Sequence, residues 1–326
     1  MKYHLLLLAL GIGSLVFGAF AADPNRTPTS RAEQLFARAT ADDFLGDAAC
    51  ADCHPDKSTA FPSSLHAAPM KNSKLPLNQQ GCEGCHGAGG IHQSEDNPDV
   101  VAFKKWNAKD SSAACLRCHD ATLSDAHWKQ SGHAKAGLSC VSCHQIHPDS
   151  SPTPEKGDVR TSAASNPADV TKIATKSSHG LLKASEAKLC GQCHAPQLAQ
   201  FRLTSHHPVP EGQMLCSSCH DAHPSKTMKG RVETDKSACV TCHREQAGPF
   251  VFEHDPVSMG TGDGCGECHR PHGSNNPNLL SSFSRGMCAQ CHTEKLAAHY
   301  PGRTCWTAGC HVAPHGSQTD DKFLQP

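Results

Sequence analysis

The hydrophobic residues of this chain are concentrated in one continuous run close to its first residue. Lys2 precedes an apolar stretch from Leu5 to Phe20, and Ala19 and Ala21 have the small side chains of a cleavage site. This pattern predicts a signal peptide over residues 1–21 that is removed on export. The alternative is an uncleaved membrane anchor, because the run approaches the length that spans a bilayer. No later segment is apolar enough to cross a membrane as a helix, so we expect an exported protein that is soluble after cleavage.

The rest of the chain has only one clear amphipathic pattern. Residues 30–44 favour a short helix with Leu35 and Phe36 on its inner face. Frequent Gly and Pro elsewhere predict short helices separated by irregular chain, and no segment has the sustained alternation of a β-strand. Residues 148–169 are rich in Pro, Ser and charged residues, which is typical of a loop or linker. We therefore expect mainly irregular coil with short α-helices and little or no β-sheet.

The composition is too poor in apolar side chains for an ordinary core of this size. Hydrophobic residues make up 37% of the 326 residues and aromatic residues 5%. The net charge of −1 gives no electrostatic reason to expect nucleic-acid binding. The 20 cysteines and 24 histidines are the unusual feature. A group other than side chains is therefore needed to fill the interior.

The cysteines fall into ten pairs, and a histidine directly follows the second cysteine of every pair. C-x-x-C-H is the pattern of covalent haem attachment, in which both thiols form thioethers and the histidine binds the iron. The nine strict copies are Cys50/Cys53/His54, Cys82/Cys85/His86, Cys115/Cys118/His119, Cys140/Cys143/His144, Cys190/Cys193/His194, Cys216/Cys219/His220, Cys239/Cys242/His243, Cys265/Cys268/His269 and Cys288/Cys291/His292. A tenth copy, Cys305/Cys310/His311, has four residues between its cysteines. The sequence thus predicts ten c-type haems.

Two other uses of paired cysteines compete with this interpretation. Exported cysteines often form disulfides, and repeated C-x-x-C pairs can bind zinc. Neither requires a histidine after the second cysteine, and ten such histidines do not arise by chance. The wider tenth motif leaves an alternative open, in which only Cys310 forms a thioether and Cys305 stays free.

The repeating unit is a pair of motifs, present five times. From Cys190 onward the motifs begin 26, 23, 26, 23 and 17 residues apart, and alternate motifs share the surroundings "CHQIHP", "CHDAHP", "CHRPHG" and "CHVAPHG". We predict an N-terminal segment over residues 22–46 and pentahaem regions over 47–195 and 196–326. A single continuous body, with residues 148–169 as a surface loop, is equally compatible with the spacing.

The remaining histidines are sufficient to give every iron a second imidazole. Thirteen lie outside both the motifs and the signal peptide. The repeat selects two for each unit, one before and one after the even-numbered motif. The distal candidates are His66, His92, His133, His147, His207, His223, His254, His272, His299 and His315. His206 is the alternative to His207, and His127 and His179 are left without a ligand role.

The distal histidines are expected to cross-link neighbouring haems. His147 follows His144 too closely to reach the opposite face of the same iron, so we predict that it binds the iron of a neighbouring motif. Two imidazoles fill the axial positions and leave no place for a substrate. We therefore expect an elongated decahaem electron carrier with the haems as its core, and not an enzyme. The haem propionates should also give the holoprotein an isoelectric point well below the sequence value of 7.1.

The motif order resembles that of the MtrA/MtoA/PioA family of decahaem c-type cytochromes, which is related to DmsE. The matching stretches are "LHAAPMKNSKLPLNQQGCEGCHG", "SHHPVPEGQMLCSSCHDAHP", "GPFVFEHDPV" and "CGECHRPHGS". The tenth motif departs from the family, which more usually has a strict C-x-x-C-H there. The resemblance implies a periplasmic protein at the outer membrane, seated in a β-barrel porin of the MtrB/MtoB/PioB type. It also implies exchange of electrons with periplasmic or inner-membrane cytochromes and with extracellular iron, either directly or through an extracellular multihaem cytochrome.

Three functions are therefore carried forward. The leading hypothesis is an outer-membrane electron conduit for Fe(II) oxidation or Fe(III) reduction. A soluble periplasmic shuttle or storage cytochrome is the second. A multihaem reductase is the third, and it would need an iron with an open axial position.

Overall fold

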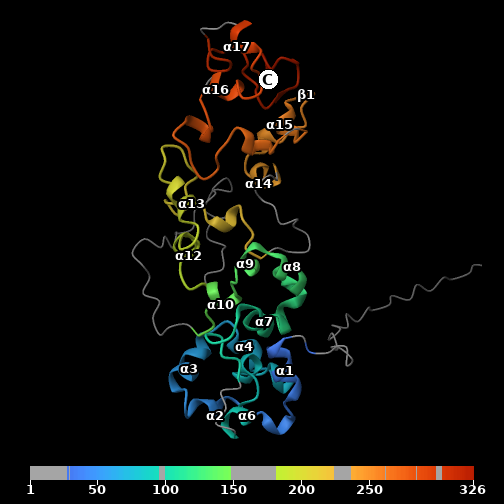
Figure 1. Ribbon diagram of the computed structural model, residues 1–326, viewed down its shortest axis with the longest axis vertical. Helices are drawn as coiled ribbons and strands as arrows, with labels where there is room; N and C mark the ends of the chain where they lie inside the picture. Colours follow the sequence, from blue (N-terminus) through green and yellow to red (C-terminus); the bar gives the residue numbers. More distant parts are fainter. Residues whose placement is uncertain are drawn as a thin grey trace, which may run out of the picture.

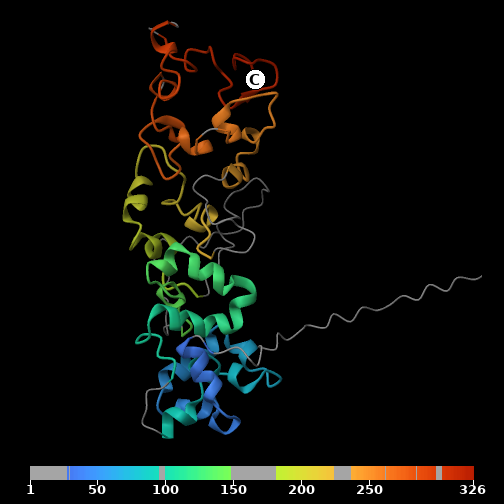
Figure 2. The ribbon, with the colours of Figure 1, turned by 45° about the vertical axis from the view of Figure 1, so that its right-hand side comes forward.

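The computed structural model shows an elongated molecule in which the chain runs from one end to the other in sequence order (Figure 1, Figure 2). It describes residues 28, 30–94, 100–147, 181–223, 236–260, 262–283, 285–298 and 303–326. The predicted signal peptide, the segment 148–169, His179 and His299 lie outside the described residues. The division into two pentahaem regions therefore stays a prediction.

Short helices dominate the described part of the chain, as the sequence predicts. In the N-terminal half they are α1 (Arg31–Arg38), η1 (Ala41–Asp43), α2 (Asp47–Ala51), α3 (Pro55–Ala60), η2 (Phe61–Ser63), α4 (Ala67–Met70), η3 (Leu77–Gln79), α5 (Glu83–His86), α6 (Gly89–Ser94), α7 (Ala108–Leu123), α8 (Asp125–Gln130), α9 (Gly132–Lys135) and α10 (Cys140–Cys143). None of the helices in the described residues combines the length and hydrophobicity that crossing a membrane requires.

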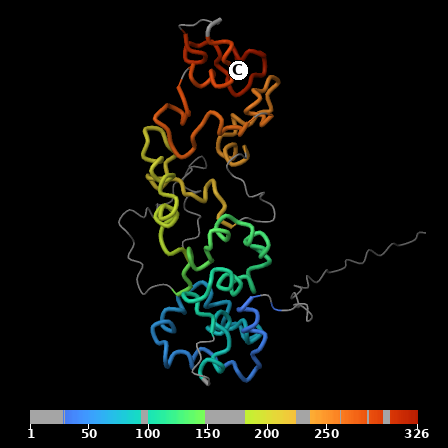
Figure 3. The backbone as a smooth tube through the Cα atoms, viewed as in Figure 1, coloured from blue at the N-terminus to red at the C-terminus, as the bar shows by residue number. Residues whose placement is uncertain are grey.

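The C-terminal half has shorter helices and two very short strands. Its elements are α12 (Glu186–Gly191), α13 (Ala195–Gln200), η4 (Cys216–Ser218), α14 (Lys236–Val240), η5 (Arg244–Gln246), β1 (Phe252–Glu253), α15 (Asp255–Ser258), η6 (Gly264–Glu267), η7 (Pro277–Leu279), α16 (Arg285–Cys288), α17 (Lys295–Ala298) and β2 (Gly316–Ser317). The strands pair antiparallel, with Phe252 opposite Ser317. Much of this half is irregular backbone (Figure 3).

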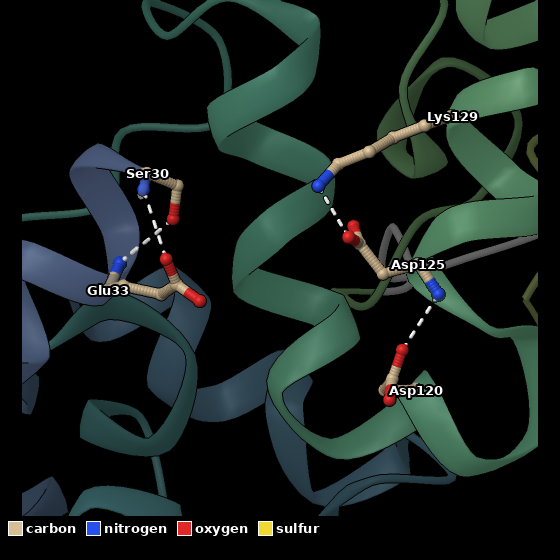
Figure 4. Close-up of polar contacts among 5 residues, drawn as sticks. All are labelled: Ser30, Glu33, Asp120, Asp125 and Lys129. Atoms are coloured by element: carbon tan, nitrogen blue, oxygen red, sulfur yellow. Dashed lines mark hydrogen bonds and ion pairs between the residues drawn. The ribbon is translucent and has the colours of Figure 1, made fainter. Parts of the chain in front are cut away.

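The predicted amphipathic helix is present as α1, and its beginning is fixed by a capping box. The Ser30 hydroxyl accepts a hydrogen bond from the Glu33 amide at 3.1 Å, and the Glu33 carboxylate accepts one from the Ser30 amide at 3.0 Å (Figure 4). The same figure shows the start of α8, where the Asp125 amide donates to the Asp120 carboxylate at 2.7 Å and Lys129 forms an ion pair with Asp125. Side-chain caps thus stabilise helices that are too short to be stable alone.

A small hydrophobic core lies between α1 and α7. Its buried members are Ala32, Leu35, Phe36, Val101 and Ala114, which confirms the inward placement of Leu35 and Phe36. The Arg117 guanidinium lies 3.3 Å from the centre of the Phe36 ring and donates to the carbonyls of Gly84 and Asn78, each at 3.2 Å. These contacts connect α1 and α7 to the second motif.

The two halves differ in how many apolar side chains they bury. Nine buried hydrophobic residues lie among the described residues of the N-terminal half, and only Leu280 and Met287 in the C-terminal half. Several large hydrophobic side chains of the C-terminal half are exposed, including Val251 and Phe283. Side-chain burial alone therefore gives the C-terminal half little stability, which agrees with the shortage of apolar residues in the sequence.

Candidate haem-binding sites

Each strict motif folds into a single turn that carries its two thiols and its imidazole. In eight strict motifs the histidine amide donates a hydrogen bond to the carbonyl of the first cysteine, at 2.9 to 3.0 Å. The third motif lies within α7, where the same spacing is that of the helix itself. The histidine side chain is thereby placed one turn after the first cysteine. This local geometry is set by the five-residue motif and needs no distant contact.

None of the twenty cysteines forms a disulfide, and all are at least partly exposed. The structure therefore gives no support to a disulfide framework. Among the residues it describes, no three side chains of His, Cys, Asp or Glu converge as a metal cluster requires, which is not the arrangement of a structural zinc site. The thiols remain available for covalent attachment.

The two cysteines of a motif differ in their exposure. The first cysteine of every motif is half-buried, whereas seven of the ten second cysteines are exposed. The exposed second cysteines are Cys53, Cys118, Cys193, Cys219, Cys242, Cys291 and Cys310.

Cys53 illustrates the physical reason for this exposure. It lies in the turn that joins α2 to α3, one residue before His54, and its side chain is exposed. The half-buried Cys50 precedes it by three residues, and its thiol has the thiol of Cys82 as a close neighbour. The turn therefore directs its first thiol toward the rest of the protein and leaves its second thiol at the surface. The attachment role predicted for Cys53 stays a prediction.

Eight motif histidines face a histidine from outside the motifs. The ring centroids of each pair are 5.6 to 6.4 Å apart. The pairs are His66–His119, His86–His147, His133–His194, His144–His223, His207–His243, His220–His272, His254–His292 and His269–His315. Two imidazoles that bind one metal from opposite sides, each through a bond of about 2 Å, have ring centroids about 6 Å apart. The pairs therefore fit one haem iron each.

The pairs connect neighbouring units in a reciprocal pattern. We number the units 1 to 5, each with two motifs, beginning at Cys50, Cys115, Cys190, Cys239 and Cys288. The histidine before an even motif faces the odd motif of the next unit, as His66 of unit 1 faces His119 of unit 2. The histidine after an even motif faces the even motif of the preceding unit, as His147 of unit 2 faces His86 of unit 1. Every adjacent pair of units thus exchanges two histidines.

Backbone carbonyls orient several of these rings. The Nδ1 atoms of His86, His207, His254 and His269 lie 2.7 to 3.0 Å from the carbonyls of Val101, Pro271, Pro314 and Asn278, in that order. A carbonyl can only accept, so each Nδ1 must carry the proton and donate it. The Nε2 atom is then unprotonated, which is the form that binds a metal. These carbonyls are functional contacts that the sequence analysis missed.

A repeated tetrapeptide holds the exchanged histidines together in the C-terminal half. Pro-His-Gly-Ser occurs at 271–274 and again at 314–317. Ser274 pairs through its backbone with Ser205, two residues before His207, and Ser317 pairs with Phe252, two residues before His254. The forward and backward histidines of adjacent units are therefore fixed by one short bridge, and the repeated tetrapeptide was the sequence signal for it.

Burial lowers the pKa of six imidazoles in these pairs. Loss of solvent disfavours the charged ring in every case and is the largest cause. They are His66, His86, His144, His147, His254 and His315. These rings therefore stay neutral down to a lower pH than a free imidazole does. The neutral ring is the form that binds a metal.

The structure distinguishes His207 from His206. His206 directs Nδ1 to the Leu203 carbonyl at 2.6 Å and Nε2 to the Glu211 carboxylate at 3.1 Å. The hydrogen bond to Glu211 raises the pKa of this imidazole. His207 instead faces His243. The geometry therefore agrees with the choice of His207 as the distal candidate.

Two distal candidates, one in each end unit, are not part of the eight ring pairs. His92 is exposed at the end of α6, and His299 lies outside the described residues. The eight ring pairs do not include the motif histidines His54 and His311, which lie at opposite ends of the file. The exchange pattern leaves His92 and His299 as the candidate second ligands of the irons at His54 and His311.

Thiol contacts place the motifs side by side in sequence order. In four of the five units the thiols of the two first cysteines are close neighbours, in the pairs Cys50–Cys82, Cys115–Cys140, Cys190–Cys216 and Cys288–Cys305. Between units the second cysteines lie near one another, in the pairs Cys85–Cys118, Cys143–Cys193, Cys219–Cys242 and Cys268–Cys291. Thiols of first and of second cysteines therefore approach one another alternately along the molecule.

Known proteins share both the motif pairs and the chain's wider sequence. The doubled CXXCH motif matches residues 206–248 and 254–297, and the cytochrome c-type protein NrfB-like model matches residues 82–161. The multiheme cytochrome MtrA of Shewanella baltica is 31% identical over 221 residues, which is 65% of this chain and 57% of that protein. The C-type polyheme cytochrome OmcB of Geobacter sulfurreducens is 33% identical over 110 residues, or 31% of this chain and 14% of that protein.

The chain thus spans less than two thirds of the length of these relatives. The matched regions nevertheless contain the paired motifs, and the described backbone has the short helices and irregular segments expected of a fold built around haem. The chain is a multihaem c-type cytochrome that is similar in sequence to MtrA of Shewanella baltica.

Proposed function

We propose that the chain binds ten haems in a continuous file, each iron between two imidazoles, and conducts electrons along its length. The cysteines of the nine strict motifs would form thioethers, Cys310 would hold the tenth haem, and the ten motif histidines would be the proximal ligands. The eight reciprocal imidazole pairs are the observation that carries this proposal, because they give interior irons two ligands and connect every unit to the next. When bound, haem supplies an iron that exchanges one electron between its ferric and ferrous forms.

The protein's own contribution is to fix ligands and exclude substrates. Imidazoles held at both axial positions leave no open site for bond chemistry, and rings oriented by backbone carbonyls need little rearrangement between redox states. The resting ferric protein should therefore be wholly low-spin by electron paramagnetic resonance. A high-spin iron in the untreated protein would instead favour a multihaem reductase.

We further propose that the chain is periplasmic and spans the outer membrane inside a β-barrel of the MtrB/MtoB/PioB type. Its elongated shape and sequential motif order support a role in carrying electrons from one side to the other (Figure 1). Its electron-transfer partners would be periplasmic or inner-membrane cytochromes on one side and extracellular iron on the other. Similarity to MtrA of Shewanella baltica is the basis for naming these partners.

Vesicles provide the test of this conduit. Proteoliposomes containing the chain and an MtrB-type barrel would enclose a reduced redox dye, with ferric citrate outside. We expect the dye to be oxidised only when both proteins are present. Failure of the chain to bind the barrel, with free transfer between soluble partners, would favour the soluble shuttle.

The holoprotein should focus well below pH 7.1, the isoelectric point of the polypeptide. Each haem brings two propionates, so ten haems convert a chain of net charge −1 into a strongly acidic protein. Isoelectric focusing of the purified holoprotein measures this. Focusing at or above neutrality would contradict the expected number of haems.

Gly273→Ala should open the iron site at His220. Gly273 has a φ of +159°, and a Cβ there would lie 2.0 Å from the Gln200 carbonyl oxygen. The clash must move the adjacent His272, whose ring faces His220. We expect about one tenth of the ferric haem to become high-spin, as when one of ten irons loses a ligand. Gly132→Ala is the control, because nothing lies within 4 Å of that added Cβ; an equal effect in both variants would contradict the assignment.

A further inference from the structure

The last motif differs from the other nine by two extra residues between its cysteines. We infer that Cys305 and Cys310 both form thioethers, and that the two extra residues form a loop outside the attachment turn. This inference rests on the proposed function, in that it assumes a c-type haem at His311. It concerns a modification that the motif pattern alone leaves open.

The backbone of the wide motif closes on the same hydrogen bond as the strict motifs. The His311 amide donates to the Cys305 carbonyl at 3.0 Å, although six positions separate the two residues. In the strict motifs the equivalent bond is 2.9 to 3.0 Å over four positions. The first cysteine and the histidine are therefore joined by the same backbone hydrogen bond in the strict motifs and in the wide motif.

The extra length is taken up by a turn between the cysteines. The Gly309 amide donates to the Trp306 carbonyl at 2.9 Å, and Gly309 has a φ of +75°, which glycine adopts without strain. Residues 307–309 are exposed. Trp306 is half-buried, and its ring packs edge-on against Phe283 with centroids 6.2 Å apart. The added residues thus point away from the turn that presents the thiols.

The thiol of Cys305 occupies the position of a first cysteine. In units 1, 2 and 3 the thiols of the two first cysteines are close neighbours. Cys305 makes this contact with Cys288, the first cysteine of the other motif in unit 5. A cysteine displaced by the two extra residues would not keep this contact.

The exposure of the two thiols also follows the strict pattern. Cys305 is half-buried and Cys310 is exposed, as Cys50 is half-buried and Cys53 is exposed in the first motif. The wide motif thus directs one thiol toward the protein and one toward the surface. Its two cysteines therefore keep the distinct environments of a first and a second cysteine.

The histidines that follow also keep the register of the other units. The Nδ1 atom of His311 lies 2.6 Å from the Lys322 carbonyl, which leaves Nε2 for a metal, as in His86 and His269. His315 reaches back to His269 in unit 4. The backbone, both thiols and both imidazoles therefore agree that the wide motif presents the same groups as a strict one.

The attachment needs no oxidant or reductant. Each S–H bond adds across one vinyl C=C bond of haem, so that sulfur bonds to one vinyl carbon and the thiol hydrogen goes to the other. Two thiols saturate the two vinyl groups. The same balanced addition at Cys305 and Cys310 leaves no free thiol in the chain.

Mass spectrometry and thiol alkylation of the full-length holoprotein test the inference. We expect ten haem masses, no cysteine alkylated by iodoacetamide after denaturation, and a pyridine haemochrome spectrum of fully saturated vinyl groups. Alkylation of Cys305 in the wild-type protein would overturn the inference. Nine doubly attached haems with one singly attached haem would do so while leaving the proposed function intact, whereas absence of covalent haem would contradict the proposed function itself.

Two variants provide matched comparisons. Cys305→Ser should leave ten haems but shift the haemochrome band of about one tenth of them, and we expect the same of Cys50→Ser in a strict motif. Deletion of Thr307 and Ala308 converts the segment to Cys-Trp-Gly-Cys-His and should leave haem count and spectrum unchanged. An unshifted Cys305→Ser spectrum beside a shifted Cys50→Ser spectrum would contradict attachment at Cys305.

Discussion

His147→Ala is expected to open the iron at His86, in the preceding unit, and to leave the iron at His144 unchanged. The ring of His147 lies 6.2 Å from that of His86, whereas His144 faces His223 at 5.6 Å. Loss of the imidazole removes one axial ligand without touching a thioether. We expect about one tenth of the ferric haem to become high-spin, with ten haems still attached covalently. Electron paramagnetic resonance and mass spectrometry measure the two effects.

His127→Ala is the control for this variant. His127 lies in α8 of the same half, and no imidazole pairs with its ring among the described residues. It should therefore leave all irons low-spin. A second comparison is His223→Ala, which should open the iron at His144. If His147→Ala and His223→Ala opened the same iron, the reciprocal exchange would be refuted.

Phe36→Ala should destabilise the N-terminal half by about 3–5 kcal/mol. The Phe36 ring is buried in the core between α1 and α7, and the Arg117 guanidinium lies on its face. Truncation leaves a cavity and removes this cation–π contact. Denaturant unfolding followed by far-ultraviolet circular dichroism measures the loss.

Phe283→Ala provides the matched control in the C-terminal half. The Phe283 side chain is 48% exposed, so its removal costs little transfer free energy and should lower stability by less than about 1 kcal/mol. Equal losses in the two variants would mean that the core between α1 and α7 does not determine the stability of the N-terminal half.

The motif turns and the proximal histidines could be predicted from sequence because they are local. C-x-x-C-H closes within five residues, so neither the tertiary fold nor the haem is needed to place Cys82, Cys85 and His86 relative to one another. The short helices and the inward face of α1 also follow from local patterns. The repeat also selected the eight histidines outside the motifs that face a motif histidine, whereas the roles of His92 and His299 stay predictions.

The partner of each distal histidine could not be read from the sequence. His147 was expected to reach a neighbouring motif, but spacing alone does not say whether it reaches backward or forward. Long-range backbone contacts decide this, such as the Ser205–Ser274 bridge and the bond from His207 to Pro271. The choice between His206 and His207 likewise depends on Glu211, whose carboxylate is hydrogen-bonded to the ring of His206.

The difference between first and second thiols was also missed. Cys50 and Cys53 are equivalent in the motif pattern, yet only Cys53 is exposed. The contact that distinguishes them is the approach of the Cys50 thiol to Cys82, a residue of the next motif. Such a contact depends on how two motifs pack, which their separate sequences do not encode.

The reciprocal exchange of histidines determines how the molecule can change in length. An interior unit sends one imidazole forward and one backward, and it receives one from each neighbour. If unit 3 were excised as a block, His133 of unit 2 would meet His243 of unit 4, and His272 would meet His144. In the shortened chain, each histidine that crosses the junction would again face a motif histidine. Such a protein can therefore become longer or shorter by two haems at a time. Insertion of a single motif would instead leave a histidine on each side of it without a partner.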